Sequence, residues 1–258
     1  WKSVASDVTG KYQIAAAGLD NGQEGVYLST SYGRKWTKSS APPAKYLSVA
    51  SDKTGNYLTA ISNDSVFISP LRGTTWERTS AGVQNWVSVC TSDSGQYIFA
   101  ASQRSHKAGG IISASDSYGL EWQATSAPLH YWTAIACDSS GQFITAAAQS
   151  HTGGETVGGG IYTSSDFGRN WTRTSAPESY WKYVVSDATG QHLAAASAMT
   201  GSGSGHIFTS ADFGATWVQT SSPEETWASI ASDYSGANLA GVVSRGEVFL
   251  SEDFGRTW

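Results

Sequence analysis

Histidine is the side chain most often used for proton transfer and metal binding near neutral pH, and this chain has five histidines. Four of them lie in or next to polar segments between predicted strands: His106, His130, His151 and His206. These four come from separate parts of the chain and show none of the short spacings of a metal-binding motif. We therefore predict no metal site and no cofactor, and we take the four as candidate binding residues. The fifth, His192, opens a predicted strand where related segments have Tyr or Phe, which favours a structural role.

Two tyrosines add ring surface to this candidate set. Tyr131 and Tyr180 each stand one place before a tryptophan that opens a repeated segment. A tyrosine combines a flat apolar ring with a hydroxyl group, so it stacks well on a sugar ring or on a side chain of a protein partner. We predict that both rings are exposed and contribute to binding.

The acidic residues of the polar segments are candidates for acid–base chemistry, of which glycoside hydrolysis is one example. This hydrolysis needs two carboxyl groups on either side of the glycosidic bond, or a tyrosine nucleophile with an acid. The acidic residues of the polar segments are Asp20, Glu24, Asp64, Glu155, Glu178, Glu224 and Glu225. They fall in predicted loops and form no pair anchored on strands, so we predict no catalytic residue and no enzyme activity.

An octapeptide repeat shows which elements position these residues. SSDFGRNW, which ends at Trp171, has five variants: STSYGRKW, SPLRGTTW, SDSYGLEW, SADFGATW and SEDFGRTW. The tryptophans that end the six copies recur every 40–49 residues and are Trp36, Trp76, Trp122, Trp171, Trp217 and Trp258. A period of roughly 45 residues suits a four-stranded propeller blade.

A second landmark divides each repeat into strands. An aromatic residue opens each unit: Trp1, Tyr46, Trp86, Trp132, Trp181 and Trp227. The strand that it opens ends in an Asp-x-Thr/Ser-Gly turn, although the third unit has Ser92 in place of the Asp. An alanine-rich strand, a third strand and the octapeptide follow, and the octapeptide leads into a fourth strand. We expect the opening aromatic residues to pack between blades.

The predicted fold class is therefore all-β, a six-bladed β-propeller with four antiparallel strands per blade. We predict one domain over residues 1–258. The expected blades are 1–45, 46–85, 86–131, 132–180, 181–226 and 227–258. The last blade is expected to be incomplete in this chain, and either flanking residues or a strand from another molecule would complete it.

Antiparallel order predicts two different faces. The Asp-x-Thr/Ser-Gly turns and the octapeptides share one face and are uniform in length. The other face receives the variable loops at residues 19–25, 103–110, 149–160 and 199–206, together with the turns between blades. Variable loops on a rigid scaffold are the usual place for binding, so we predict that partners bind to this second face.

The octapeptides resemble the Asp-box, S-x-D-x-G-x-T-W, also called the bacterial neuraminidase repeat, which is found in sialidase-like propellers. Asp166, Asp212 and Asp253 fill its Asp position, and the remaining copies have Ser31, Leu71 and Ser117 there. The resemblance implies a folding role for these aspartates and for the six box tryptophans. It also implies a sialidase-like glycoside hydrolase as the alternative function. The Arg-Ile-Pro element of such enzymes is missing here, so the chain is identified as a non-catalytic member.

Composition limits the classes of partner that the chain is expected to bind. Net charge is −5, and charged residues make up 14% of the chain, against roughly 25% in an average domain. We predict no nucleic-acid partner, since no basic surface is indicated. No stretch reaches the ~20 apolar residues that cross a bilayer, so no membrane insertion is predicted. Richness in Ser, Thr and Gly favours a secreted, extracellular or cell-surface protein.

Two kinds of covalent modification are also predicted. Asn63 and Asn170 each open an Asn-x-Ser/Thr sequon for N-glycosylation. Cys90 and Cys137 occupy nearby places in neighbouring units, where they form either a disulfide or two buried thiols. Taken together, the sequence predicts an extracellular binding or structural scaffold propeller. Its partner is a protein or a glycan, and self-assembly is a further prediction.

Overall fold

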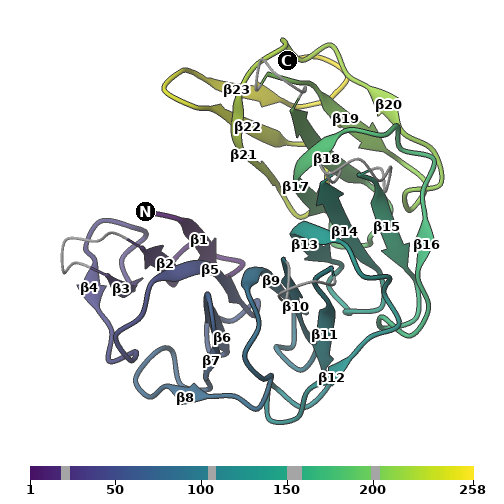
Figure 1. The fold of residues 1–258 in the computed structure, drawn as a ribbon. Helices are drawn as coiled ribbons and strands as arrows, with labels where there is room; N and C mark the ends of the chain where they lie inside the picture. The colour runs from purple at the N-terminus through teal and green to yellow at the C-terminus, as the bar shows by residue number, and fades with distance from the viewer. Residues whose placement is uncertain (19–23, 104–108, 150–158, 199–203) are drawn as a thin grey trace. The chain divides into compact units, whose positions relative to one another are not determined.

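A computed structural model describes residues 1–18, 24–103, 109–149, 159–198 and 204–258. The described residues form strands joined by turns, without a helix, and divide into two compact units, Trp1–Thr125 and Ser126–Trp258 (Figure 1). Each unit contains three small antiparallel sheets, and each sheet is one blade. The predicted fold class is confirmed: the chain is an all-β, six-bladed β-propeller. That all six blades form a single domain stays a prediction.

Unit 1 contains the first three blades. Their strands are β1 (Ser3–Ser6), β2 (Gln13–Ala17), β3 (Gly25–Ser29) and β4 (Thr37–Lys38); β5 (Tyr46–Ser51), β6 (Leu58–Ser62), β7 (Val66–Ser69) and β8 (Glu77–Arg78); and β9 (Trp86–Thr91), β10 (Ile98–Ser102), β11 (Ile112–Ser115) and β12 (Gln123–Ala124). Hydrogen bonds join the strands of each blade in chain order. Each blade is therefore a simple up-and-down meander.

Unit 2 contains the last three blades. Their strands are β13 (Tyr131–Cys137), β14 (Ile144–Gln149), β15 (Ile161–Ser164) and β16 (Thr172–Arg173); β17 (Tyr180–Ser186), β18 (Leu193–Ala198), β19 (Ile207–Ser210) and β20 (Val218–Gln219); and β21 (Trp227–Ser232), β22 (Leu239–Val243) and β23 (Val248–Ser251). The sixth sheet has three strands and the other five have four, as predicted.

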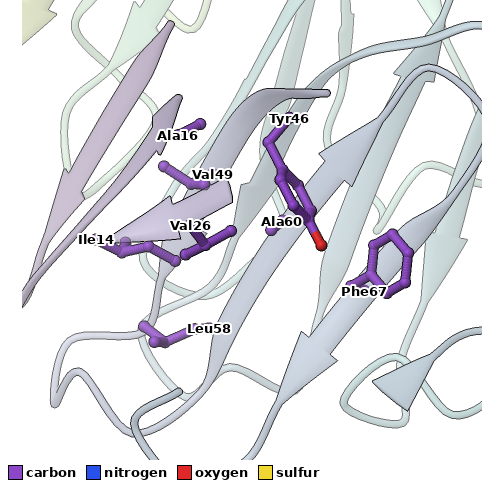
Figure 2. Close-up of a cluster of buried hydrophobic side chains, with 8 residues drawn as sticks. All are labelled: Ile14, Ala16, Val26, Tyr46, Val49, Leu58, Ala60 and Phe67. Carbon is purple, nitrogen blue, oxygen red and sulfur yellow. The ribbon is translucent and has the colours of Figure 1, made fainter. Parts of the chain in front are cut away.

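The core of each unit lies between neighbouring blades. In unit 1, β5 packs against β1 and β2 of the preceding blade, and Figure 2 shows Ile14, Val26, Tyr46, Val49 and Phe67 at this junction. Alanines such as Ala16 and Ala60 are fully buried there. Their small side chains let the two sheets approach closely, which accounts for the alanine-rich second strands.

Five of the six aromatic residues that open the repeats pack between blades, as predicted, and Trp1 is the exception. Tyr46, Trp86, Trp132 and Trp181 are 0% exposed and Trp227 is 1% exposed. A β-bulge follows these residues in blades 2 to 6, and it leaves one extra residue on the first strand, such as Leu47 or Lys182. Trp1 packs against Tyr27 and Trp36 of its own blade, and the residue is 68% exposed.

Asp-x-Thr/Ser-Gly turns join the first two strands of each blade. In the first blade the Asp7 Oδ1 atom accepts a hydrogen bond from the Tyr12 N–H at 2.9 Å, and Oδ2 accepts one from the Thr9 hydroxyl at 2.5 Å. Ser92 replaces the Asp in the third blade, and its hydroxyl accepts the equivalent bond from the Tyr97 N–H at 3.1 Å. The residue after the Asp then donates its N–H to the next blade, as from Val8 to the Lys53 carbonyl at 3.0 Å.

The octapeptides fold as one hairpin turn with a shared set of bonds. The first serine ends the third strand, and its hydroxyl accepts a hydrogen bond from the glycine N–H, as in Ser164 and Gly168 at 3.0 Å. Asp166 Oδ1 accepts the N–H of Asn170 at 2.8 Å, and the Trp171 Nε1–H donates to the Gly168 carbonyl at 3.0 Å. Asp212 and Asp253 make the same bonds with Thr216 and Thr257. The resemblance to the Asp-box therefore extends to its structural role.

The copies that lack the Asp close the turn in other ways. Ser31 and Ser117 accept the backbone bond with a hydroxyl, from the N–H groups of Lys35 and Glu121 at 2.9 Å each. Leu71 has no acceptor in its side chain. Its carbonyl accepts the Thr74 N–H, as the equivalent carbonyl does in the other boxes, and also accepts the Thr74 hydroxyl. The turn is therefore kept in all six copies, although its side-chain acceptor differs.

The residue before the box glycine has a left-handed backbone and stacks on the preceding blade. Its φ lies between 53° and 61° in all six boxes, although none of these residues is glycine. Every junction within a unit has such a stack. The pairs are Arg72 on Tyr12, Tyr118 on Tyr57, Phe213 on Phe143 and Phe254 on His192. Contact with the preceding blade offsets the cost of the left-handed backbone, which is about 1–2 kcal/mol.

Acid should weaken the box turns, because their aspartates are held in the charged form. The Thr257 N–H and hydroxyl lower the pKa of Asp253 from 3.8 to about 2, and the Thr216 hydroxyl is the main cause of the lowered pKa of Asp212. A carboxyl group whose pKa is lowered by folding stabilises the fold fully above its unfolded pKa, and this stabilisation is lost as the pH falls toward the folded pKa. We expect the melting temperature to fall between about pH 4 and about pH 2.

The variant Asp253→Asn tests this expectation by differential scanning calorimetry. It should melt at a lower temperature than the wild type at pH 6 and should lose less on acidification, because it has one fewer carboxylate to protonate. An equal acid-induced fall in both proteins would show that the Asp253 turn does not contribute.

Candidate binding face

Within each unit, one face carries the loops between second and third strands and the turns between blades; we call it the loop-bearing face. Backbone hydrogen bonds join these segments, from Trp86 N–H to the Asn63 carbonyl at 3.1 Å and from Gln103 N–H to the Asn85 carbonyl at 2.8 Å. The boxes and Asp turns are joined to each other instead, as by Tyr32 N–H and the Lys11 carbonyl at 3.3 Å. The predicted division into two faces is therefore confirmed for each unit.

The structure describes four of the six predicted binding residues. His106 and His151 lie outside the described residues. His130, Tyr131, Tyr180 and His206 all belong to the loop-bearing face of unit 2 and are half-buried, so the two tyrosines are less exposed than predicted. Tyr131 and Tyr180 pair with Gln149 and Ala198 at the ends of their sheets. The backbone pairing holds both tyrosines at the rim of a blade.

His130 belongs to a compact aromatic cluster in blade 4. Its Nε2 atom lies 2.6 Å from the Tyr162 hydroxyl oxygen, and its ring meets the Trp132 ring edge-on with 5.5 Å between centroids. Tyr162 also packs against Trp132, with 5.3 Å between centroids. We call His130, Trp132 and Tyr162 the blade-4 cluster.

One polar atom of this cluster departs from the pattern of the other blades. The aromatic residue that opens the blade donates to the carbonyl four residues earlier in three cases: Tyr46 to Pro42, Trp86 to Gly82 and Trp181 to Pro177. The Trp132 Nε1–H is buried and has no such partner among the described residues. The blade-4 cluster therefore contains a buried hydrogen-bond donor, the Trp132 Nε1–H, beside the His130 imidazole.

An ion pair lies next to the blade-4 cluster. The Arg173 Nη2 atom is 3.1 Å from Glu178 Oε1, and both side chains are substantially exposed. Burial, and to a lesser degree the charge of Arg173, lowers the pKa of His130. Burial also raises the pKa of Tyr162. Both partners of the 2.6 Å hydrogen bond are therefore held neutral at pH 7, and the imidazole tautomer decides which of the two donates.

This electrostatic state does not activate Tyr162 as a nucleophile. A tyrosine nucleophile is activated by a lowered pKa or by a base that takes its proton. The raised pKa of Tyr162 and the lowered pKa of His130 both oppose that transfer. Tyr162 is also buried, at 8% exposure, whereas His130 is half-buried.

The other predicted residues are placed as follows. The His206 backbone is bonded to the Ser197 hydroxyl, and its Nδ1 atom is buried without a partner among the described residues. The Asn63 side chain is exposed in the β6–β7 turn, whereas the Asn170 amide donates to Asp166 Oδ2 at 2.7 Å. Glycosylation at either asparagine stays a prediction.

The two cysteines are half-buried on first strands, Cys90 on β9 opposite Phe99 and Cys137 on β13 opposite Ile144. One lies in each unit, and a disulfide between them stays a prediction. His192 has the structural role predicted for it, since its Nδ1 atom lies 3.0 Å from Asp187 Oδ2 and its ring stacks on Phe254.

Sequence reasoning missed Tyr162 and Arg173. They are direct cross-strand partners on β15 and β16, and blade 2 has the equivalent pair, Phe67 and Arg78, on β7 and β8. The sequence shows an aromatic residue in the third strand and a cation in the fourth. That they face each other depends on the register of the two-residue fourth strands, which the repeat pattern does not supply.

Comparison with known proteins is consistent with the fold. The BNR-Asp box repeat family matches residues 161–174 and 207–220. The sequence matches no curated protein. Among solved structures, a GH74 xyloglucanase from Xanthomonas campestris has 15% identity and a TM-score of 0.74, over 98% of this chain and 45% of the enzyme chain. This chain thus spans less than half the length of that enzyme.

Two further structures are complexes with a partner. YCF48 bound to a D1 peptide has 13% identity and a TM-score of 0.69, and the match covers 100% of this chain and 80% of the other. A chain of a nidogen/laminin complex has 11% identity and a TM-score of 0.63, with 84% and 78% covered. Similarity at this level shows the fold alone. No helix in the described part of the chain is long and apolar enough to span a membrane. The chain is a six-bladed β-propeller that carries BNR-Asp box repeats.

Proposed function

We propose that the chain is a non-catalytic binding propeller that acts outside the cell and recognises a protein or glycan partner through its loop-bearing face. The observation that carries this proposal is the neutral His130–Tyr162 pair at 2.6 Å, flanked by the Arg173–Glu178 ion pair. Donors, acceptors and ring surface are gathered there without an activated nucleophile. A protein partner is further supported by the similarity to propellers that were solved with a peptide and with laminin.

A glycoside hydrolase is the alternative, and the similarity to GH74 enzymes favours it. That similarity concerns the fold, and one propeller fold carries many activities. Hydrolysis would also need a carboxylic acid as proton donor, and the Glu178 carboxylate beside the blade-4 cluster is paired with Arg173. We therefore place binding ahead of hydrolysis.

A scaffold role is the second form of the proposal. In unit 2 the strand β23 is the edge of its sheet, and Val248 and Leu250 on this strand are 61% and 64% exposed. An exposed apolar edge strand is a common place for another strand to add, either from flanking residues of the same protein or from a second chain. Light scattering should then show oligomers at micromolar concentration, and the charged variant Leu250→Lys should dissociate them. A wild-type protein that remains monomeric would contradict the scaffold role.

The binding proposal is tested on glycan and peptide arrays, with a panel of chromogenic glycosides assayed in parallel. We expect binding without hydrolysis. Tyr162→Phe should weaken binding by about three- to tenfold, because it removes the hydroxyl that anchors His130. Tyr234→Phe is the matched control, since Tyr234 is 63% exposed on the opposite face of unit 2. Glycoside hydrolysis that Tyr162→Phe abolishes, or equal effects of the two variants on binding, would overturn the proposal.

A further inference from the structure

A cavity of about 590 Å³ lies on the loop-bearing face of unit 1, in blade 2. Its walls are residues 42–45 from the turn before β5 and residues 62–65 from the turn between β6 and β7, with Phe67 and Arg78 completing it. Phe67 is 6% exposed and packs edge-on against Tyr46, and Figure 2 shows these two rings next to each other. We call this cavity the blade-2 pocket.

The blade-2 pocket occupies the place that the His130 imidazole occupies in blade 4. Ala44 stands two residues before Tyr46, as His130 stands two residues before Trp132. Phe67 faces Arg78 across β7 and β8, as Tyr162 faces Arg173 across β15 and β16. In blade 4 the imidazole packs against Trp132 and bonds to Tyr162. In blade 2 the methyl group of Ala44 and the ring of Phe67 leave that space open.

The arginine at this position also differs in its pairing. Arg173 holds the carboxylate of Glu178, five residues further along the chain, at 3.1 Å. The residue five places after Arg78 is Val83, which is 70% exposed and has no charge. Among the described residues, no carboxylate forms an ion pair with Arg78. The blade-2 pocket therefore presents an arginine whose counterpart in blade 4, Arg173, is already paired with a glutamate.

The pocket contains one carboxylate of its own, Asp64, which is bound elsewhere. Its Oδ1 atom accepts hydrogen bonds from the Ser62 hydroxyl at 2.9 Å and the Ser65 hydroxyl at 3.1 Å. The Ser62 bond is the main cause of the lowered pKa of Asp64, and the charge of Arg78 adds to it. The pocket lining has two cations, Lys45 and Arg78, and this one anion.

We propose that the blade-2 pocket binds the side chain of a glutamate from a protein partner, with Arg78 holding the carboxylate as Arg173 holds Glu178. The methylene stem of the glutamate would pack against the apolar wall that Pro42, Ala44 and Phe67 provide. The template for this contact is an amino-acid side chain within the same chain, and this favours an acidic peptide over an acidic glycan. The inference rests on the proposed function and names its partner class at a second place on the loop-bearing face.

The experiment is a titration of the ¹⁵N-labelled chain with N-acetyl-glutamate N-methylamide, followed by the NMR signal of the Arg78 side-chain Nε–H. The glutamine analogue and glucuronate are titrated in parallel. We expect a saturable shift with the glutamate compound and little shift with the other two. Asp64→Asn should bind the glutamate compound about threefold more tightly or better, because it removes a competing negative charge.

Two arginine variants make the matched comparison. Loss of a charge-assisted hydrogen bond typically weakens binding about tenfold or more, so Arg78→Gln should do so. This is read from the signals of the Ser62 and Ser65 backbone N–H groups. Arg34→Gln, at an exposed arginine in the box of blade 1 on the opposite face of unit 1, should leave the affinity unchanged. Equal shifts with the glutamate and glutamine compounds, or unchanged affinity in Arg78→Gln, would overturn the inference. A larger response to glucuronate would also overturn it, in favour of an acidic glycan.

The same proteins separate failure of this inference from failure of the proposed function. If the arrays show binding that Tyr162→Phe weakens, and the blade-2 pocket does not bind the glutamate compound, only the inference about the blade-2 pocket is wrong. If the pocket binds glutamate while the arrays give hydrolysis that depends on Tyr162, the binding role proposed for the blade-4 cluster is wrong.

Discussion

Trp181→Ala should lower the free energy of unfolding by about 3–5 kcal/mol, as is typical of a large aromatic residue removed from a core. The Trp181 ring is 0% exposed between blades 4 and 5. It packs with Ala147, Ile161, Val184 and Ala195 and lies against Phe208 and Trp217. Its Nε1–H donates to the Pro177 carbonyl at 3.1 Å, so the substitution removes packing and also leaves a carbonyl without its donor.

Urea denaturation followed by circular dichroism measures this loss. Trp181→Phe is the informative companion, because it keeps a ring in the junction and loses the indole N–H, and it should cost less than the alanine variant. Tyr234→Ala, at a ring that is 63% exposed, should change stability little. A loss for Trp181→Ala no greater than that for Tyr234→Ala would mean that the blade junction is not the core of unit 2.

Gly119→Ala is the second substitution with a large expected cost, about 2–5 kcal/mol, for two reasons. Gly119 has a φ of +85°, a left-handed value that costs an alanine about 1–2 kcal/mol. A Cβ atom at this position would also lie 2.6 Å from Ile68 Cγ2 of the preceding blade and 3.4 Å from Ile98 Cδ1. Overpacking of this kind typically adds about 1–3 kcal/mol.

Gly82→Ala separates the two contributions. Gly82 has nearly the same φ, +82°, but a Cβ atom there would have no neighbour within 4 Å. It should therefore show only the backbone cost, and the difference between the two variants in urea denaturation measures the close approach of blades 2 and 3. Adding Ile68→Ala to Gly119→Ala should cost less than the sum of the two single substitutions. Equal costs for Gly82→Ala and Gly119→Ala would contradict the close approach.

The repeat made most of the fold predictable. Tryptophan and glycine at fixed places in the octapeptide, with an Asp-x-Thr/Ser-Gly turn earlier in each unit, determine where strands end and which turns share a face. The burial of Tyr46, Trp86 and their equivalents followed from the same alignment. These features depend on local turn chemistry and on periodicity, and both can be recognised in a single sequence.

The interactions that differ between copies could not be predicted in this way. The left-handed residue of the box is Phe, Tyr or Arg, and its partner lies in the preceding blade, so no local signal joins Tyr118 to Tyr57. The candidate binding residues were predicted from their loops. Among the described ones, His130 is bonded to Tyr162, a partner that only the register of the strands could reveal. The blade-2 pocket depends on two differences between copies, Ala44 in the place of His130 and Phe67 in the place of Tyr162, and their combined effect shows only in three dimensions.

The stack between blades has a consequence for how such a chain can grow. Blades 1 to 5 carry both halves of the contact, a flat ring at the start of the second strand and a left-handed residue in the box, whereas blade 6 has Asn238 at the first of these places. Tyr57 thus receives Tyr118 from the following blade, while Arg72 of the same blade covers Tyr12 of the preceding one. A gene segment that encodes one such period therefore supplies one contact residue for the preceding blade and one for the following blade. Tandem duplication can add a copy without inventing a new junction, and the copies can then diverge in the loops that take no part in docking.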